Sequence, residues 1–240
     1  MIFLIFIFKK SSGKVRIIRR NATSLFLDNI LDQIDIHNGI YLVDTTRMKK
    51  PQKKRQLTLR QACAIESAAL TNPQDKIYII FVSPQPLDSI DFTEELEILN
   101  SYQNIHPLSL NLVQFVIDTP LEKLIANGDI FGSHFIKSHT SDVLRLLLLW
   151  KYGGTYLDSD MIVRLELNQL PPNYICKDHG FLNGAIINLD TKRGRNFAEI
   201  FMKDMLENFN GTVWGSVGPD IFLNVMSKIC GTSVVREMRN

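Results

Sequence analysis

Two aspartates near the middle of the chain are the strongest candidates for chemistry. Asp158 and Asp160 follow the apolar pair Tyr156-Leu157. Because residues two apart on an extended chain point to the same side, both carboxylates can face one bound cation. Such oxygen ligands suit Mn²⁺ or Mg²⁺, which commonly bridges protein carboxylates and a substrate diphosphate. A chain of this composition contains about one Asp-x-Asp by chance, so the triplet alone identifies nothing.

A second charged pair, Asp142 and Arg145, lies on the helix predicted for Ser141–Tyr152. Ser141 can cap this helix, and the Gly-Gly pair after it can end it. The three-residue spacing favours an ordinary ion pair with an acidic group in the first helical turn. A role for both side chains in holding a ligand is the alternative.

Apolar strands and amphipathic helices alternate along the chain, which predicts a Rossmann-like α/β fold with a mainly parallel sheet and helices on both faces. Ligands of such sheets bind outside the carboxyl ends of the strands. We predict strands over Gly39–Val43, Lys76–Val82, Thr155–Val163 and Phe181–Leu189, a strand or loop over Ile105–Val116, and helices over Leu57–Leu70, Glu94–Ser101, Pro120–Asn127, Ser141–Tyr152, Arg195–Phe209 and Pro219–Cys230.

The composition fits one globular domain with a substantial core, since 45% of the 240 residues are hydrophobic and 22% are charged. A net charge of +2 with scattered basic residues gives no basis for nucleic-acid binding. The spacing of Cys63, Cys176 and Cys230 fits no metal site. They are either small buried residues or one disulfide and one free thiol.

The N-terminus is unusual, because the apolar run Met1–Phe8 precedes a basic segment that extends to residue 20. A membrane-spanning helix needs about 20 apolar residues, so the run is a stub of a signal anchor, a short buried strand or a product of gene prediction. We therefore separate residues 1–20, an apolar stub and basic segment, from a domain over residues 39–240. The sequons at Asn21 and Asn210 permit a lumenal location.

A composite motif carries more information than any of these pairs. The segments Ser141-Asp142-Val143-Leu144-Arg145 and Tyr152-Gly153-Gly154-Thr155-Tyr156-Leu157-Asp158-Ser159-Asp160 resemble the S-D-x-x-R…Y/F-G-G-x-Y-x-D-x-D signature of the DXD glycosyltransferases. Further segments resemble the α-1,4-galactosyltransferase (globotriaosylceramide synthase) family in particular. These are Arg60–Ala69 with Asn72-Pro73, Tyr152–Val163, Leu182–Ala185, and Trp214-Gly215 with Gly218-Pro219.

The resemblance implies a GT-A fold and a role for each site residue. Asp160 is expected to be a direct metal ligand, and Asp158 to contact the metal shell together with the ribose or sugar. Asp142 and Arg145 are expected to hold the donor sugar through hydroxyl and phosphate contacts. Asn183 is expected near the donor sugar or acceptor, beside a glycine that permits close approach, or else simply in an Asn-Gly turn. No catalytic nucleophile is assigned.

Two other segments are expected near the site. Tyr41–Thr46, at the end of the first strand, occupies the place where this fold class usually seats the uridine. Trp214 is expected either in the core or as a platform for the acceptor.

Family membership further implies a retaining enzyme that moves galactose or N-acetylgalactosamine from a UDP-sugar, with Mn²⁺ or Mg²⁺. The acceptor would be a lactosylceramide-like glycolipid, joined through an α1,4 linkage, and the catalytic domain would be lumenal in the Golgi membrane. Relatives continue past Asn240 with a His-x-Trp-Asn-like motif, so we expect the domain to be incomplete at its C-terminus. The alternative is an inactive truncated homologue that binds UDP, glycan or a partner protein.

A phosphatase of the haloacid dehalogenase type also places Asp-x-Asp after a strand. That class explains neither Asp142 nor Arg145, and it needs its motif near the start of the domain.

Overall fold

The computed structural model describes residues 36–48, 56–83, 92–178, 180–190, 192–235 and 238. Residues 1–20, which we predicted to be a separate segment, lie outside the described part. In that part, no helix has the length and apolar character needed to cross a membrane. The three cysteines are free, without a disulfide between any two of them.

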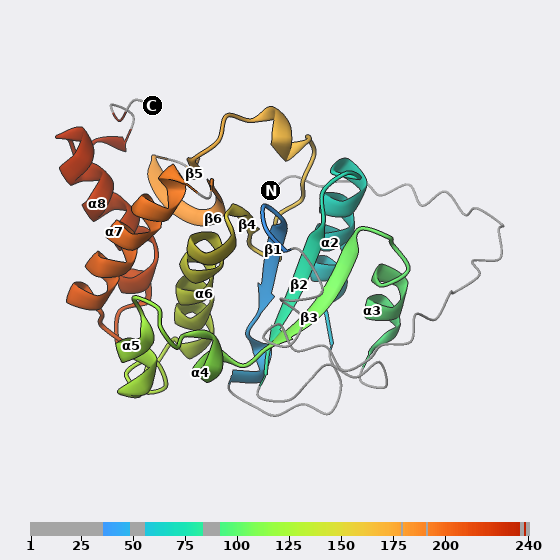
Figure 1. Ribbon diagram of the computed structural model, residues 1–240, viewed down its shortest axis with the longest axis horizontal. Helices are drawn as coiled ribbons and strands as arrows, with labels where there is room; N and C mark the ends of the chain where they lie inside the picture. Colours follow the sequence, from blue (N-terminus) through green and yellow to red (C-terminus); the bar gives the residue numbers. More distant parts are fainter. Residues whose placement is uncertain are drawn as a thin grey trace.

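A six-stranded sheet with the order β3-β2-β1-β4-β6-β5 forms the centre of the molecule (Figure 1). Neighbours among β3, β2, β1 and β4 are parallel, whereas β6 is antiparallel to both β4 and β5. The predicted α/β fold with a mainly parallel sheet is confirmed. The strands are β1 (Ile40–Asp44), β2 (Ile77–Val82), β3 (Ile105–Leu110), β4 (Gly154–Leu157), β5 (Tyr174–Asp178) and β6 (Phe181–Leu189).

Helices cover both faces of this sheet because alternate side chains of the strands point in opposite directions. On β1, Tyr41 and Val43 join the core beneath α6, α7 and α8, whereas Ile40 and Leu42 join the core beneath α2 and α3. The helices are α2 (Leu59–Thr71), α3 (Glu94–Leu99), α4 (Leu112–Phe115), α5 (Glu122–Ala126), α6 (Ile136–Tyr152), α7 (Arg193–Asn208) and α8 (Pro219–Cys230). Short 3₁₀ turns are η1 (Thr46–Met48), η3 (Leu167–Gln169) and η4 (Trp214–Val217).

Helix α6 is the main support of the sheet, and its start was predicted wrongly. The helix begins at Ile136, so Ser141 lies in its interior and does not cap it. Nearly every residue from Asp142 to Leu149 is buried, because the helix packs between the sheet and α7. The start was placed too late because Ser141, which directly precedes the buried run, is a residue type common at helix caps.

The two glycines after α6 fix the connection to β4. Gly153 and Gly154 both have positive φ, 64° and 97°, which favours glycine. A Cβ on Gly154 would lie 2.3 Å from the carbonyl oxygen of Gly39. The close contact brings β4 alongside β1, as the Thr155 N–H bond to that same oxygen at 2.9 Å confirms.

The strand after this connection is shorter than predicted, because β4 ends at Leu157 rather than at Val163. Asp158 and Asp160 therefore lie in a turn, closed by a 3.1 Å bond from the Met161 N–H to the Asp158 carbonyl. Strand alternation was the wrong reason for placing the two carboxylates together. Strand β5 was not predicted, since its exposed Lys177 and Asp178 give no apolar pattern.

Candidate functional site

A cleft of about 760 Å³ opens where β1 and β4 end, between η4 and the start of α2. Residues from several elements line this cleft, because the sheet brings those elements together. Such a cleft is expected at the carboxyl ends of parallel strands. All five residues that the sequence predicted as site residues line it, namely Asp142, Arg145, Asp158, Asp160 and Asn183. The segment that follows β1 lines it as well, through Asp44, Thr45 and Thr46.

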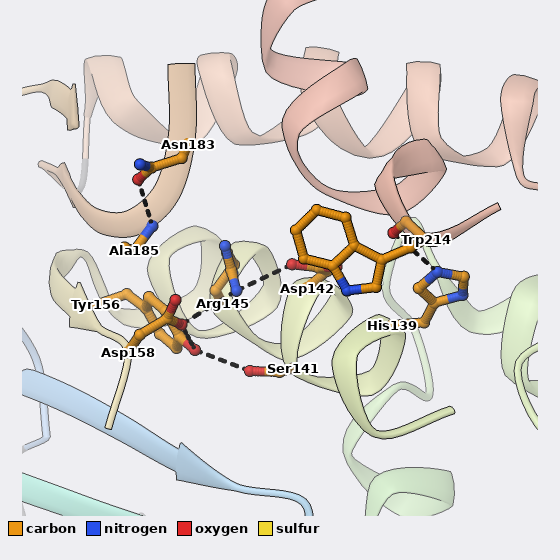
Figure 2. A network of polar contacts seen from close by, with 9 residues as sticks. All are labelled: His139, Ser141, Asp142, Arg145, Tyr156, Asp158, Asn183, Ala185 and Trp214. Atoms are coloured by element: carbon orange, nitrogen blue, oxygen red, sulfur yellow. Dashed lines mark hydrogen bonds and ion pairs between the residues drawn. The ribbon is translucent and has the colours of Figure 1, made fainter. Parts of the chain in front are cut away.

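Arg145 is the centre of a buried charge network (Figure 2). Its Nη2 lies 2.9 Å from Asp142 Oδ1 and 3.2 Å from Asp158 Oδ1. Arg145 and Asp142 are only 6% and 7% exposed, so the pair is not the solvated ion pair that its spacing suggested. Its Nε is buried without a hydrogen-bond partner in the described part of the chain. A buried unpaired donor beside a cleft is a feature that a bound ligand would satisfy.

Tyr156 connects this network to the body of α6. Its hydroxyl donates to Asp158 Oδ1 at 2.8 Å, so the Ser141 hydroxyl, also 2.8 Å away, donates to the phenol oxygen. The guanidinium carbon of Arg145 lies 4.8 Å from the centre of the Tyr156 ring. From the sequence, Ser141 was expected to cap the helix and Tyr156 had no expected role. A place for Ser141 near the site could have been predicted, because Ser141 lies one helical turn before Arg145 and so on the same face of the helix.

Two glycines make room for the network. A Cβ on Gly184 would lie 1.7 Å from Arg145 Nη1, so no other residue fits there while Arg145 keeps its position. A Cβ on Gly218 would lie 3.0 Å from Asp142 Oδ1. Gly184 was predicted to permit close approach, and in this structure the approaching group is the guanidinium of Arg145.

Burial controls the protonation of these groups. Desolvation raises the pKa of Asp142 to about 6, although Arg145 opposes this and Asp158 adds to it. Desolvation lowers the pKa of Arg145, but the charges of Asp142 and Asp158 outweigh it and hold the pKa above its usual range. Desolvation and the charge of Asp158 raise the pKa of Tyr156, which keeps the phenol protonated as a donor.

The second aspartate of the turn is far less constrained. The side chain of Asp160 is 54% exposed, and its Oδ2 lies 3.4 Å from Nη2 of Arg60, which is 74% exposed. Pairs this exposed contribute little and can be displaced by a ligand. Asp158 is 34% exposed, and both of its hydrogen bonds from Arg145 and Tyr156 end on Oδ1.

The two carboxylates fit a cation that also binds a substrate. Among the described residues, no group of three or more His, Cys, Asp or Glu side chains could hold a metal by itself. Asp158 and Asp160 line one cleft, and their side chains are 34% and 54% exposed. Mg²⁺ and similar ions are commonly held by one or two carboxylates, with phosphate and water supplying the other ligands.

Three further residues line the cleft. Asn183 lies on β6 rather than in a turn, and its Oδ1 accepts the Ala185 N–H at 3.0 Å. Asp44 accepts from the N–H and hydroxyl of Thr46, at 2.9 and 3.0 Å, and so shapes the corner after β1. Trp214 is not in the core, since it is 57% exposed and lines the cleft.

Comparisons with known proteins agree with this fold and identify a family. Residues 58–176 match the glycosyltransferase sugar-binding region containing a DXD motif, and residues 190–240 match the α1,4-glycosyltransferase conserved region. The solved structure of the PaToxG glycosyltransferase shares the fold, with a TM-score of 0.53 and 15% identity over 81% of this chain and 69% of that one. The chain belongs to the DXD-motif glycosyltransferases.

Within that class it is a member of the α-1,4-galactosyltransferase family. It is 30% identical to the human lactosylceramide 4-alpha-galactosyltransferase over 178 residues, and the chimpanzee protein gives the same identity over 179 residues. A human alpha-1,4-N-acetylglucosaminyltransferase is 23% identical over 210 residues. The chain spans about half the length of the curated galactosyltransferases, with 74% of it aligned to 50% of the human protein.

Proposed function

We propose that this chain binds a UDP-sugar together with Mn²⁺ or Mg²⁺ and transfers the sugar to a glycolipid. The transfer retains the anomeric configuration and forms an α1,4 linkage to a terminal galactose, as in lactosylceramide. The observation that carries this proposal is the buried Asp142–Arg145–Asp158 network beside the exposed carboxylate of Asp160, all lining one cleft.

The donor sugar is galactose or an N-acetylhexosamine. Relatives named for galactose transfer are 30% identical to this chain, and one named for N-acetylglucosamine transfer is 23% identical. We place galactose first for that reason, with N-acetylgalactosamine second, because it keeps the axial hydroxyl of galactose.

Asp158 and Asp160 are the side chains that would hold the cation. When bound, the cation neutralises the charge that develops on the departing diphosphate. The chain itself would orient the donor. The Asp142 carboxylate accepts hydrogen bonds from sugar hydroxyls, while Arg145 holds that carboxylate and Asp158 in place and keeps its unpaired Nε for a ligand oxygen.

Positioning is the main contribution that these residues can make. Donor and acceptor held in one cleft react without the entropy loss of a bimolecular encounter. We assign no side chain as a nucleophile, and the acceptor hydroxyl is proposed to attack on the face from which the diphosphate leaves, with the leaving phosphate taking the proton. Groups fixed before binding, such as Arg145, need no reorganisation during the reaction.

We also propose that the protein is located in the Golgi membrane, with its catalytic domain in the lumen. Asn210 of the sequon is exposed, and the Thr212 hydroxyl donates to its side-chain oxygen at 2.7 Å. Expression in animal cells followed by peptide mapping after glycosidase treatment tests whether the chain reaches a glycosylating compartment.

The first experiment is calorimetric titration of UDP into the 240-residue chain with and without Mn²⁺. We expect binding that depends on Mn²⁺ and that Asp160→Asn weakens by about 100-fold or more, since the substitution removes a charged metal ligand. Asp129→Asn is the matched control, because Asp129 is exposed and outside the cleft. Folded protein that binds no UDP would overturn the proposal, and UDP binding without transfer from either UDP-sugar would favour the non-catalytic alternative.

A further inference from the structure

The two tryptophans of the chain differ in how their indole rings are used. Trp150 is half-buried, donates from Nε1 to Glu199 at 2.8 Å, and has the guanidinium of Arg195 4.4 Å from its ring centre. The indole of Trp214 has neither a hydrogen bond nor a ring partner among the described residues, although it lines the cleft. Tryptophan is enriched at interfaces because it combines a large apolar ring with an N–H donor, so an indole without a partner at a cleft points to an external ligand.

The backbone that carries Trp214 is, in contrast, firmly held. The Nε2 of the fully buried His139 lies 3.2 Å from the Trp214 carbonyl oxygen, and its Nδ1 lies 2.8 Å from the Ser133 hydroxyl. The Ser216 hydroxyl lies within 2.9 Å of the carbonyl oxygens of Asn210 and Val213. An aromatic side chain on a fixed backbone gives contact area at low cost in conformational entropy.

The position of Trp214 separates it from the donor end of the cleft. Asp44 and Thr45 line the cleft at the end of β1, where the proposed function places the nucleotide. Trp214 belongs to η4, which packs against α6 and α8 beyond β4 and β6. Figure 2 shows the indole near Asp142, on the side away from Tyr156 and Asp158. In that view, Asp142 and Arg145 lie between the indole and the pair Tyr156 and Asp158.

We propose that Trp214 is the platform on which the acceptor sugar stacks. The ligand class is a terminal β-galactoside, because its axial 4-hydroxyl leaves the C3, C4, C5 and C6 hydrogens on one apolar face that can cover an indole. Aromatic rings attract such polarised C–H groups and lose water-exposed apolar area on contact. The choice of galactose rests on the proposed function, whereas a sugar platform requires only the exposed ring.

Because the chain contains two tryptophans, a variant that keeps one of them tests the platform directly, without a measurement of catalysis. In a Trp150→Phe variant, Trp214 is the remaining tryptophan, and its fluorescence is titrated with lactose in the presence of UDP and Mn²⁺. We expect a saturable change with lactose and none with sucrose, which lacks galactose. The matched Trp214→Phe variant, which keeps Trp150, is expected to show no change. Trp150→Phe lies outside the cleft and controls for the loss of a tryptophan.

The same surface is tested by enzyme kinetics. We expect Trp214→Ala to raise the KM for lactose or lactosylceramide about tenfold, equivalent to about 1.4 kcal/mol, with Trp214→Phe in between. The affinity for UDP with Mn²⁺ should change less than about twofold, since the ring lies outside the donor end. A merely structural role would instead lower the folded fraction and weaken UDP and acceptor binding together.

The outcomes separate this inference from the proposed function. A chain that binds UDP but shows no lactose-dependent change in Trp214 fluorescence, or an unchanged acceptor KM in Trp214→Ala, overturns the platform and leaves the donor site standing. A chain that binds lactose at Trp214 but binds no UDP supports the platform and overturns the transferase. Failure of both titrations on folded protein overturns both.

Discussion

Asp158 and Asp160 are two residues apart, but their side chains differ in exposure and in hydrogen-bond partners. Arg145 and Tyr156 tie Asp158 to α6, in which every residue from Asp142 to Leu149 is buried. The side chain of Asp160 is 54% exposed, and its ion-pair partner Arg60 is 74% exposed. One side of the cleft is therefore fixed before any ligand arrives, and the other keeps a carboxylate in water. Substitutions on the first side should change stability, whereas substitutions on the second should change binding alone.

The largest expected effect is on the fixed side. Arg145→Met leaves the buried Asp142 carboxylate without its cation, and removing one partner of such a pair costs about 3–5 kcal/mol of unfolding free energy. Urea denaturation measures this, and Arg60→Met is the matched control with an expected cost below about 0.5 kcal/mol. Adding Asp142→Leu to Arg145→Met should recover part of the loss. Equal costs for the two arginines would show that the buried network does not stabilise the fold.

A smaller effect is expected at Gly184, which limits the space for Arg145. Gly184→Ala should lower the unfolding free energy by about 1–3 kcal/mol, because the new methyl group forces the guanidinium to move. The displaced guanidinium should also weaken UDP binding in the same calorimetric titration. Gly132→Ala is the control, since its Cβ would make an ordinary contact at 3.6 Å. A Gly184→Ala protein as stable as this control contradicts the close packing around Arg145.

Proton binding at Asp142 should make the fixed side sensitive to pH. Its pKa rises from 3.8 to about 6 on folding, so the folded state binds the proton more tightly. The contribution of Asp142 to stability is therefore greatest below pH 4 and is lost as the pH rises through about 6. We expect the unfolding free energy of the wild type, relative to Asp142→Asn, to fall by on the order of 1 kcal/mol over that range. Urea titrations in EDTA at several pH values measure it, and a parallel pH dependence of both proteins would contradict the shift.

The smallest change in stability is expected on the open side. Asp160→Asn should alter the unfolding free energy by less than about 0.5 kcal/mol, because the side chain is half-exposed and weakly paired. The same variant is the one expected to lose Mn²⁺-dependent UDP binding. A large loss of stability in Asp160→Asn would mean that both carboxylates belong to the structural network.

The sequence was sufficient for the class of fold and for four of the charged residues that line the cleft, but not for how they are joined. Asp142, Arg145, Asp158 and Asp160 could be identified because their spacing is a family pattern. Strand alternation gave the wrong reason for pairing the two aspartates, since hydrogen bonding of β4 stops at Leu157. Strand length depends on which partners lie alongside, and these are distant in sequence.

The exposure of Trp214 and the contact made by Ser141 could not be predicted from the sequence for similar reasons. The exposure of Trp214 depends on how η4 packs against α6, and a tryptophan is more often buried on average. Ser141 was interpreted as a helix cap because serine is common there, whereas its hydroxyl bonds to Tyr156 across the helix–strand contact. Local propensity cannot distinguish a cap from such a tertiary contact.

The charge network joins residues that are close together in the sequence, and this affects the order in which parts of the cleft fold. Arg145 and Asp158 are 13 residues apart, and Tyr156 and Asp158 only 2, whereas the bond that holds the Trp214 backbone to His139 spans 75 residues. Short loops close at small entropic cost, so contacts within α6 and β4 form readily. During synthesis the ribosome delivers these residues before it has made η4. The part of the cleft that contains Arg145, Tyr156 and Asp158 is thus specified while the segment that carries Trp214 is still to be translated.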